Sequence, residues 1–199
     1  MLSVICPIYN EAKYIDVCVQ SILLQDYPKQ QLEVLFVDGM SKDGTRDIVN
    51  NYSKQYPFIR LLNNEKRIVP VAMNIGIKAS IGDIVMRLDA HAQYPPNYFS
   101  VLVKELVRLR ADNVGVACKT DVLNKTSKTL AIREVLSNRF GVGNSTFRLG
   151  VDKVIEVDTV PFGCWKKDVF NKYGFYDERL IRNQDIELNK RIVRGGGHI

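Results

Sequence analysis

The chain has 199 residues, 46% of them hydrophobic and 25% charged, with a formal net charge of +6 at pH 7. This length suits one sizeable α/β domain, and the composition is ordinary for a soluble globular protein. No apolar run approaches the roughly 20 residues that a membrane-spanning helix needs. The start, MLSVICPIYNEA, lacks the basic region and the small-residue cleavage site of a signal peptide.

The cysteines indicate the redox compartment of the protein, and the charge distribution indicates the classes of ligand that suit it. The four cysteines are scattered without a C-x-x-C pair, which argues against a zinc or redox motif and fits a reducing cytoplasm. Residues 1–100 hold 10 basic and 10 acidic side chains, and residues 101–199 hold 18 and 12. A basic second half suits an anionic ligand, a membrane surface or nucleic acid, and a solvated basic face explains most of it equally well. No nucleic-acid-binding motif is present.

From the N-terminus to residue 120, short apolar runs alternate with longer amphipathic ones. The runs predict, in chain order, strand 2–9, helix 11–25, strand 32–39, helix 46–56, strand 58–64, helix 69–80, strand 82–90, helix 96–111 and strand 114–120. Such alternation predicts a mostly parallel sheet with helices on both faces.

After residue 120 the pattern is less regular. We expect a helix at 127–140, a loop at 141–153 and strand character at 154–165. The part of this loop at 141–150 is a candidate lid over a bound ligand. The segment 184–193 predicts a helix, because it begins with acidic residues, ends with basic ones and is followed by Gly195.

Polar residues follow the predicted strands where ligands bind in open α/β sheets, beyond the carboxyl ends of the strands. These residues are Pro7, Tyr9, Asn10 and Glu11 after the first strand, Asp38, Gly39, Ser41 and Asp43 after the second, and Asp89 and His91 after the fourth. The segment CPIYNEAKY lacks the G-x-G-x-x-G of a dinucleotide site, which argues against a dehydrogenase. Asp38 still stands where such folds place an acid that binds the nucleotide, and a metal ion can neutralise phosphates without a glycine loop.

Four separated blocks carry a resemblance to a known family. They read PIYNE, VDGMSKDGT, AMNIGIKASIGDIVMRLDAH and GFYDERLIRNQDIELNKRI, in this order along nearly the whole chain. Together they resemble a family 2 glycosyltransferase of the GT-A fold, and within it the bacterial exopolysaccharide enzymes related to the succinoglycan glucosyltransferases, whose metal motif also reads D-A-H. The resemblance implies a Rossmann-like α/β domain over residues 1–199, truncated at its C-terminus, with a nucleotide-binding half at 1–119 and an acceptor-binding half at 120–199.

The resemblance also implies roles for individual residues. Pro7, Tyr9 and Glu11 would line a uridine pocket, and Asp38 would accept a hydrogen bond from the uracil ring N–H. Lys66 or Arg67, together with Asn74, would face the nucleotide. The triplet Asp89, Ala90 and His91 stands at the family's D-x-D motif, which contacts the ribose and holds a divalent cation on the diphosphate. Asp185 stands at the aspartate of the E-D motif, the catalytic base.

General chemistry agrees with these roles, and two positions depart from the family pattern. Sugar transfer needs a leaving group whose charge is neutralised and a carboxylate that accepts the proton of the acceptor hydroxyl. Asp185 lies in the first turn of its predicted helix, where the helix dipole favours the ionised form. Gln184 replaces the glutamate of E-D, and His91 replaces the last aspartate of D-x-D. An imidazole ligand leads us to expect Mn²⁺ in preference to Mg²⁺.

The sequence therefore predicts an inverting, metal-dependent hexosyltransferase. It would use a UDP-linked sugar and a saccharide or lipid-linked acceptor, in exopolysaccharide or surface glycan synthesis. We expect it in the cytoplasm, with possible peripheral contact at the inner face of the plasma membrane. Two alternatives stay open. One is a nucleotidyltransferase, because the segment DGTR (43–46) resembles the glycine-rich loop of that class. The other is a non-catalytic nucleotide-sugar binding module.

Overall fold

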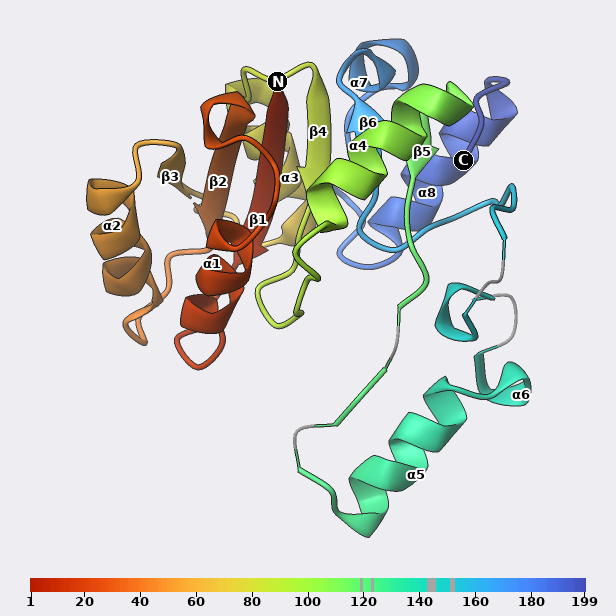
Figure 1. Cartoon of the computed structure of the whole chain (residues 1–199), viewed down its shortest axis with the longest axis horizontal. Coiled ribbons are helices and arrows are strands. Elements are labelled where there is room, and N and C mark those ends of the chain that lie inside the picture. Colours follow the sequence, from red (N-terminus) through yellow and green to blue (C-terminus); the bar gives the residue numbers. More distant parts are fainter. Residues whose placement is uncertain (119, 123, 143–145, 151–152) are drawn as a thin grey trace.

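Four parallel strands form the first part of a six-stranded sheet in the computed structural model, which describes residues 1–118, 120–122, 124–142, 146–150 and 153–199 (Figure 1). The strand order is β3-β2-β1-β4-β6-β5. The parallel strands are β1 (Leu2–Ile8), β2 (Leu32–Asp38), β3 (Ile59–Asn63) and β4 (Ile84–Arg87). β6 (Cys164–Lys166) pairs antiparallel with β4 and also with the short edge strand β5 (Asn113–Val114). The predicted mostly parallel sheet is confirmed.

Helices cover both faces of this sheet (Figure 1). α1 (Ile15–Leu23), α2 (Thr45–Gln55) and α4 (Tyr98–Leu109) pack on one face. α3 (Val69–Ala79), α7 (Asp168–Tyr173) and α8 (Gln184–Arg194) pack on the other. Single 3₁₀ turns occur at Lys29–Gln31 and Thr146–Arg148.

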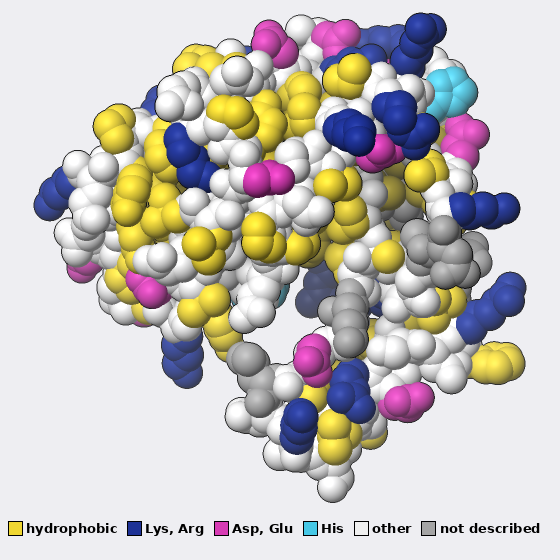
Figure 2. All heavy atoms as spheres, in the orientation of Figure 1, with side chains coloured by type: hydrophobic (Ala, Val, Ile, Leu, Met, Phe, Trp, Pro, Cys, Tyr) yellow, Lys and Arg dark blue, Asp and Glu magenta, His cyan; other side chains and the backbone are white. Residues whose placement is uncertain are grey.

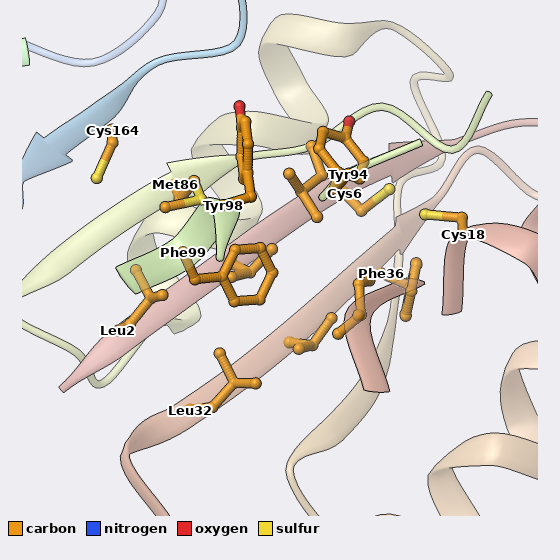
Figure 3. Packing of buried hydrophobic residues seen from close by; sticks show 14 of the residues in the cluster. Leu2, Cys6, Cys18, Leu32, Phe36, Met86, Tyr94, Tyr98, Phe99 and Cys164 are labelled. Atoms are coloured by element: carbon orange, nitrogen blue, oxygen red, sulfur yellow. The ribbon is translucent and has the colours of Figure 1, made fainter. Parts of the chain in front are cut away.

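The hydrophobic core is split by the sheet because side chains alternate between its two faces. Val4 and Cys6 of β1 contribute to the cluster under α1 and α4, whereas Ile5 contributes to the cluster under α3 and α8. Figure 3 shows part of the first cluster, in which Phe36 of β2 and Phe99 of α4 lie over the strands. Both faces of β1 and β2 are buried, which explains their continuous apolar runs.

The second half differs from the prediction in its strands. The expected strand at 114–120 is reduced to β5, and the strand character at 154–165 yields only β6, which starts at the end of that run. Phe162 and Gly163 both have positive φ immediately before β6. The strand β6 then pairs antiparallel with β4.

The segment between β5 and β6 extends away from the sheet (Figures 1 and 2). Its helices, α5 (Ser127–Leu136) and α6 (Arg139–Val142), contain no buried residue. The predicted helix at 127–140 is thus interrupted after Leu136. Of the candidate lid at 141–150, residues 143–145 lie outside the described part of the chain. Within the described residues, no helix is both long and apolar enough to cross a membrane.

Candidate functional site

A pocket of about 150 Å³ lies at the carboxyl ends of β1, β2 and β4. It brings together six of the predicted site residues from separate parts of the sequence: Pro7, Tyr9, Glu11, Arg67, Asp89 and His91. The remaining lining comes from Ile8, Val37, Gly39, Asn64, Ile68, Val69, Ala72 and Arg87. Its volume is below the roughly 300–1,000 Å³ of a typical small-ligand site, so a nucleotide-sized ligand would extend beyond it.

Hydrogen bonds between the loops after β1 and β2 hold one wall of this pocket. The backbone N–H of Glu11 donates to the Thr45 hydroxyl at 2.8 Å, and that of Ala12 donates to the Asp43 carboxylate at 3.0 Å. Asp43 also accepts from the hydroxyl and backbone N–H of Thr45 at the start of α2. The pKa of Asp43 lies below its ordinary value, mainly because the Thr45 hydroxyl donates to it. The sequence motif DGT therefore fixes the loop that carries Glu11.

Tyr9 forms a second part of the wall and packs against Gly39. The Tyr9 side chain is half exposed, and a Cβ atom at Gly39 would lie 3.0 Å from the Tyr9 Cδ2 atom. Glycine at position 39 therefore lets the aromatic ring lie flat along the end of β2, where it lines the pocket.

Three predicted nucleotide contacts lie outside the pocket lining. Asp38 is fully buried and accepts from Ser41 and, at 2.5 Å, from Arg46 Nη1. Asn74 is buried in α3, and its amide bonds to the backbone of another segment. Ala90 is 2% exposed and packs in the core. Their predicted contacts with a nucleotide stay predictions.

Asn64 is a pocket residue that sequence reasoning missed. It is 2% exposed, and its Nδ2 donates to the Ile68 carbonyl at 3.0 Å. Its Oδ1 is buried without a hydrogen-bond partner among the described residues. A buried acceptor without a partner is unusual in a folded protein. The only signal in the sequence was its place directly after the third strand.

Arg87 is a second pocket residue that sequence reasoning missed. It is the last residue of β4, and its Nε donates to Asp89 Oδ1, two residues beyond the strand end, at 3.0 Å. Burial by itself would lower the pKa of the Arg87 guanidinium, but the negative charge of Asp89 is the largest of the effects that raise it, and that pKa lies above its ordinary value. The signal was a charged residue at the end of an apolar strand, two positions before an aspartate.

Asp185, the predicted catalytic base, is on a different element from Asp89. It is half-buried in the first turn of α8, and its carboxylate accepts from the backbone N–H of Ile186 at 2.9 Å. The helix begins after Asn183, whose φ of 59° turns the chain into α8. Asp185 does not line the 150 Å³ pocket, but it is close enough to act on the charge of Arg87.

A larger groove of about 670 Å³ lies elsewhere, between α4, β5 and the segment 153–160. Its lining is mainly aliphatic and contains none of the predicted site residues. His198 is at its rim and pairs with Glu156 at 2.8 Å. We place the candidate site at the smaller pocket, because the charged and polar groups converge there.

Comparison with known proteins decides the family. The model of the family described as glycosyl transferase family 2 matches residues 3–174, which is most of the chain. The chain belongs to glycosyltransferase family 2. The predicted resemblance is thereby confirmed, and the matched region contains every residue that lines the candidate pocket.

Two relatives within this glycosyltransferase family align with nearly the whole chain. One is a dolichyl N-acetyl-alpha-D-glucosaminyl phosphate 3-beta-D-2,3-diacetamido-2,3-dideoxy-beta-D-glucuronosyltransferase from Methanococcus voltae, 30% identical over 98% of this chain and 62% of its own length. The other is the succinoglycan biosynthesis protein ExoA of Rhizobium meliloti, 30% identical over 98% of this chain and 59% of its own length. The chain thus spans about three fifths of these relatives.

Solved structures confirm the expected GT-A glycosyltransferase fold. S. aureus TarS (residues 1–349) superposes with a TM-score of 0.70 at 21% identity, covering 96% of this chain and 54% of TarS. The mannosyltransferase PcManGT from Pyrobaculum calidifontis, in complex with GDP-Man and Mn²⁺, superposes with a TM-score of 0.68 at 23% identity, covering 94% of this chain and 50% of that one.

The residues of this glycosyltransferase domain fit a divalent cation that is shared with a ligand. No group of three or more His, Cys, Asp or Glu side chains placed to bind a metal is found in the described part of the chain. His91 and Asp89 both line the pocket, and His91 Nδ1 is 3.3 Å from Glu11 Oε1, which leaves Nε2 for a metal. A cation held by few protein ligands is typical of sites that substrate phosphates complete.

Proposed function

We propose that this domain is an inverting, metal-dependent glycosyltransferase that moves a hexose from a nucleotide-sugar, UDP-linked by preference, to a saccharide or lipid-linked acceptor. The observation that carries the proposal is the single pocket that joins Tyr9 and Glu11 to Asp89 and His91 from different strand ends. An exopolysaccharide or cell-surface glycan is the proposed product. We also propose one catalytic domain with its nucleotide half at 1–119 and its acceptor half at 120–199.

The names of the relatives and the ligands bound in the similar solved structures support the proposed donor and acceptor classes. The M. voltae relative is named for a lipid-linked sugar phosphate, and the R. meliloti relative for succinoglycan biosynthesis. TarS was solved in complex with UDP and with UDP-GlcNAc, and PcManGT with GDP-Man and Mn²⁺. These complexes support a nucleotide-sugar donor here, and the UDP complexes favour UDP.

In the proposed mechanism the residues of the chain bind and orient the substrates, and one of them accepts a proton. Tyr9 and Glu11 would hold the nucleoside end of the donor. Asp185 would accept the proton of the acceptor hydroxyl as its oxygen attacks the anomeric carbon, on the side opposite the breaking bond to the diphosphate. Attack from the opposite side inverts the anomeric configuration.

Asp89 and His91 are the proposed ligands of a divalent cation. The bound cation would act as a Lewis acid that neutralises the negative charge on the leaving diphosphate. Asp89 is paired with Arg87 in the structure, so binding the cation requires Asp89 to share its carboxylate. We keep Mn²⁺ as the favoured ion because of the imidazole.

A peripheral contact with the inner face of the plasma membrane is part of the proposal. The helix α5 extends from the body with Ile132 and Val135 exposed, and Phe140 of α6 is fully exposed. Lys128 and Arg133 accompany them. Exposed apolar side chains beside basic ones suit an anionic lipid surface, near a lipid-linked acceptor.

Calorimetric titration with UDP, GDP and CMP, each with and without Mn²⁺, tests the donor site. We expect UDP to bind most tightly and its affinity to depend on the cation. Binding that is independent of metal, or no binding of any of the three, would contradict the assignment of Asp89 and His91.

Asp185→Asn tests the catalytic base. We expect kcat to fall by about 10²- to 10⁴-fold because the proton acceptor is lost, while UDP affinity is kept, as measured by transfer assays and calorimetry. Asp168→Asn is the matched control, since it also removes an acid from the first turn of a helix, at an exposed position of α7. Full transfer by Asp185→Asn would contradict the role, and UDP binding without any turnover of the parent protein would favour the non-catalytic binding module.

A further inference from the structure

Arg87 has hydrogen-bond donors that the protein itself does not use. Its Nε and Nη2 reach the two carboxylate oxygens of Asp89 at 3.0 and 3.4 Å. A guanidinium carries five N–H donors in a rigid fork. Among the described residues, Arg87 Nη1 has no hydrogen-bond partner, and it is not one of the buried atoms left unsatisfied. Nη1 is therefore reached by solvent.

The unused donors belong to a side chain that is held in place. The Arg87 side chain is only 11% exposed and lines the 150 Å³ pocket. Its backbone N–H donates to the Gly163 carbonyl at 3.1 Å, and its residue is in register with Ile5 of the central strand β1. A buried, preorganised guanidinium loses little conformational entropy when it binds a ligand.

The position and charge of Arg87 favour an anionic ligand. Asp89 contacts it directly in an ion pair, with 3.0 Å between Nε and Oδ1. A cation held by Asp89 would take up part of the charge of that carboxylate, and the guanidinium at the pocket wall would then lose part of its neutralising partner. An Arg with free donors beside a bound cation suits the oxygens of a phosphate group, which it can contact through parallel N–H bonds.

We propose that Arg87 binds the diphosphate of the donor directly, through the N–H groups that Asp89 does not use. The proposal rests on the proposed function, because it needs a nucleoside diphosphate in this pocket. Asp89 would then hold the cation and Arg87 the phosphate oxygens, from the end of β4 and the residues that follow it. Arg87 would also stabilise the charge that develops on the leaving diphosphate.

The test compares uridine, which has no phosphate, with UDP in calorimetric titrations of Arg87→Met and Arg87→Lys, with and without Mn²⁺. We expect Arg87→Met to weaken UDP binding by about 10- to 100-fold, the usual range for a hydrogen bond to a charged group, and to leave uridine affinity unchanged. The loss should appear both with and without Mn²⁺. Arg87→Lys keeps the charge without the fork, so it should recover part of the UDP affinity.

Arg60→Met is the matched control. Arg60 also pairs with a carboxylate, that of Glu33 at 2.7 Å, but it is on β3 outside the pocket. Arg60→Met should change neither the UDP affinity nor the uridine affinity. Thermal unfolding of all variants checks that they are folded.

Three results would overturn the inference about Arg87. They are unchanged or tighter UDP binding by Arg87→Met, an equal loss for uridine and UDP, and a loss that appears only with Mn²⁺. The third would mean that Arg87 acts solely through Asp89 and the cation. If the unmodified protein binds no nucleoside diphosphate, the proposed function fails first, so the two failures are distinguishable.

Discussion

At the scale of single residues, the candidate site combines side chains that the sequence pointed to with others that it did not. Asp89 and His91 were identified because they follow a strand and match a family motif. Arg87 and Asn64 were missed because an arginine at a strand end and an asparagine in a loop are ordinary residues. Only the partners of these side chains, and the atoms left without partners, distinguish them.

His91→Asp tests the metal preference at this scale. We expect Mn²⁺-dependent UDP binding to persist and the relative affinity for Mg²⁺ to rise, because a carboxylate is the harder oxygen ligand. Calorimetric UDP titrations in each metal give the ratio. Glu11, 3.3 Å from His91, would add negative charge beside the new carboxylate and strengthen binding of either cation.

Two further variants control this measurement. His198→Asp changes the other histidine, which pairs with Glu156 outside the pocket, and should leave the ratio unchanged. His91→Ala should weaken the effect of metal on UDP binding. If His91→Ala leaves that effect intact, Asp89 holds the cation alone and the histidine is a bystander.

At the scale of elements, the site depends on how the helices approach the strands. The helix α3, which carries pocket residues Val69 and Ala72, lies close against β1 through Gly76. A Cβ atom at Gly76 would lie 2.5 Å from the Cγ2 atom of Ile5. Glycine at this position therefore sets the distance between α3 and the strand that ends at the pocket.

Gly76→Ala is expected to lower the free energy of unfolding by up to about 2 kcal/mol. Overpacking of a core costs about 1–3 kcal/mol, of which alanine regains roughly 1 kcal/mol over glycine as a helix former. Urea unfolding gives the difference, with Lys78→Ala in the same helix as a control that stays within about 0.5 kcal/mol. Greater stability of Gly76→Ala would contradict this packing argument.

At the scale of the whole molecule, a few buried polar contacts join the first half of the chain to the second. Asn74 in α3 donates to the Tyr176 carbonyl at 2.9 Å and accepts from the Tyr176 N–H at 3.0 Å. Glu178 accepts from Asn74 at 3.1 Å and from Lys66 at 3.1 Å. These bonds hold the segment that precedes α8, and hence Asp185, against the first half of the chain.

Asn74→Ala is expected to lower the free energy of unfolding by about 2 kcal/mol, because it leaves the backbone groups of Tyr176 buried without partners. Asn51→Ala, at an exposed position in α2, is the matched control. Thermal or urea unfolding measures the loss. Calorimetry on the folded variant separates two roles: unchanged UDP affinity means that Asn74 only joins the halves, and weaker binding supports its predicted contact with the nucleotide.

The sequence by itself determined the layered α/β fold, the family and the strand ends that carry the site, because hydrophobic periodicity and the family blocks are local along the chain. It predicted too long a strand at 114–120, since, among the described residues of this segment, only Asn113 and Val114 find a partner strand in β6, which is about 50 residues further along the chain. Only the tertiary structure decided that Asp38 and Asn74 use their polar atoms in hydrogen bonds within the protein, and that Arg87 bonds to Asp89 at the pocket wall through only part of its donors. Such facts depend on which distant groups share hydrogen bonds in a buried space, and no local pattern records them.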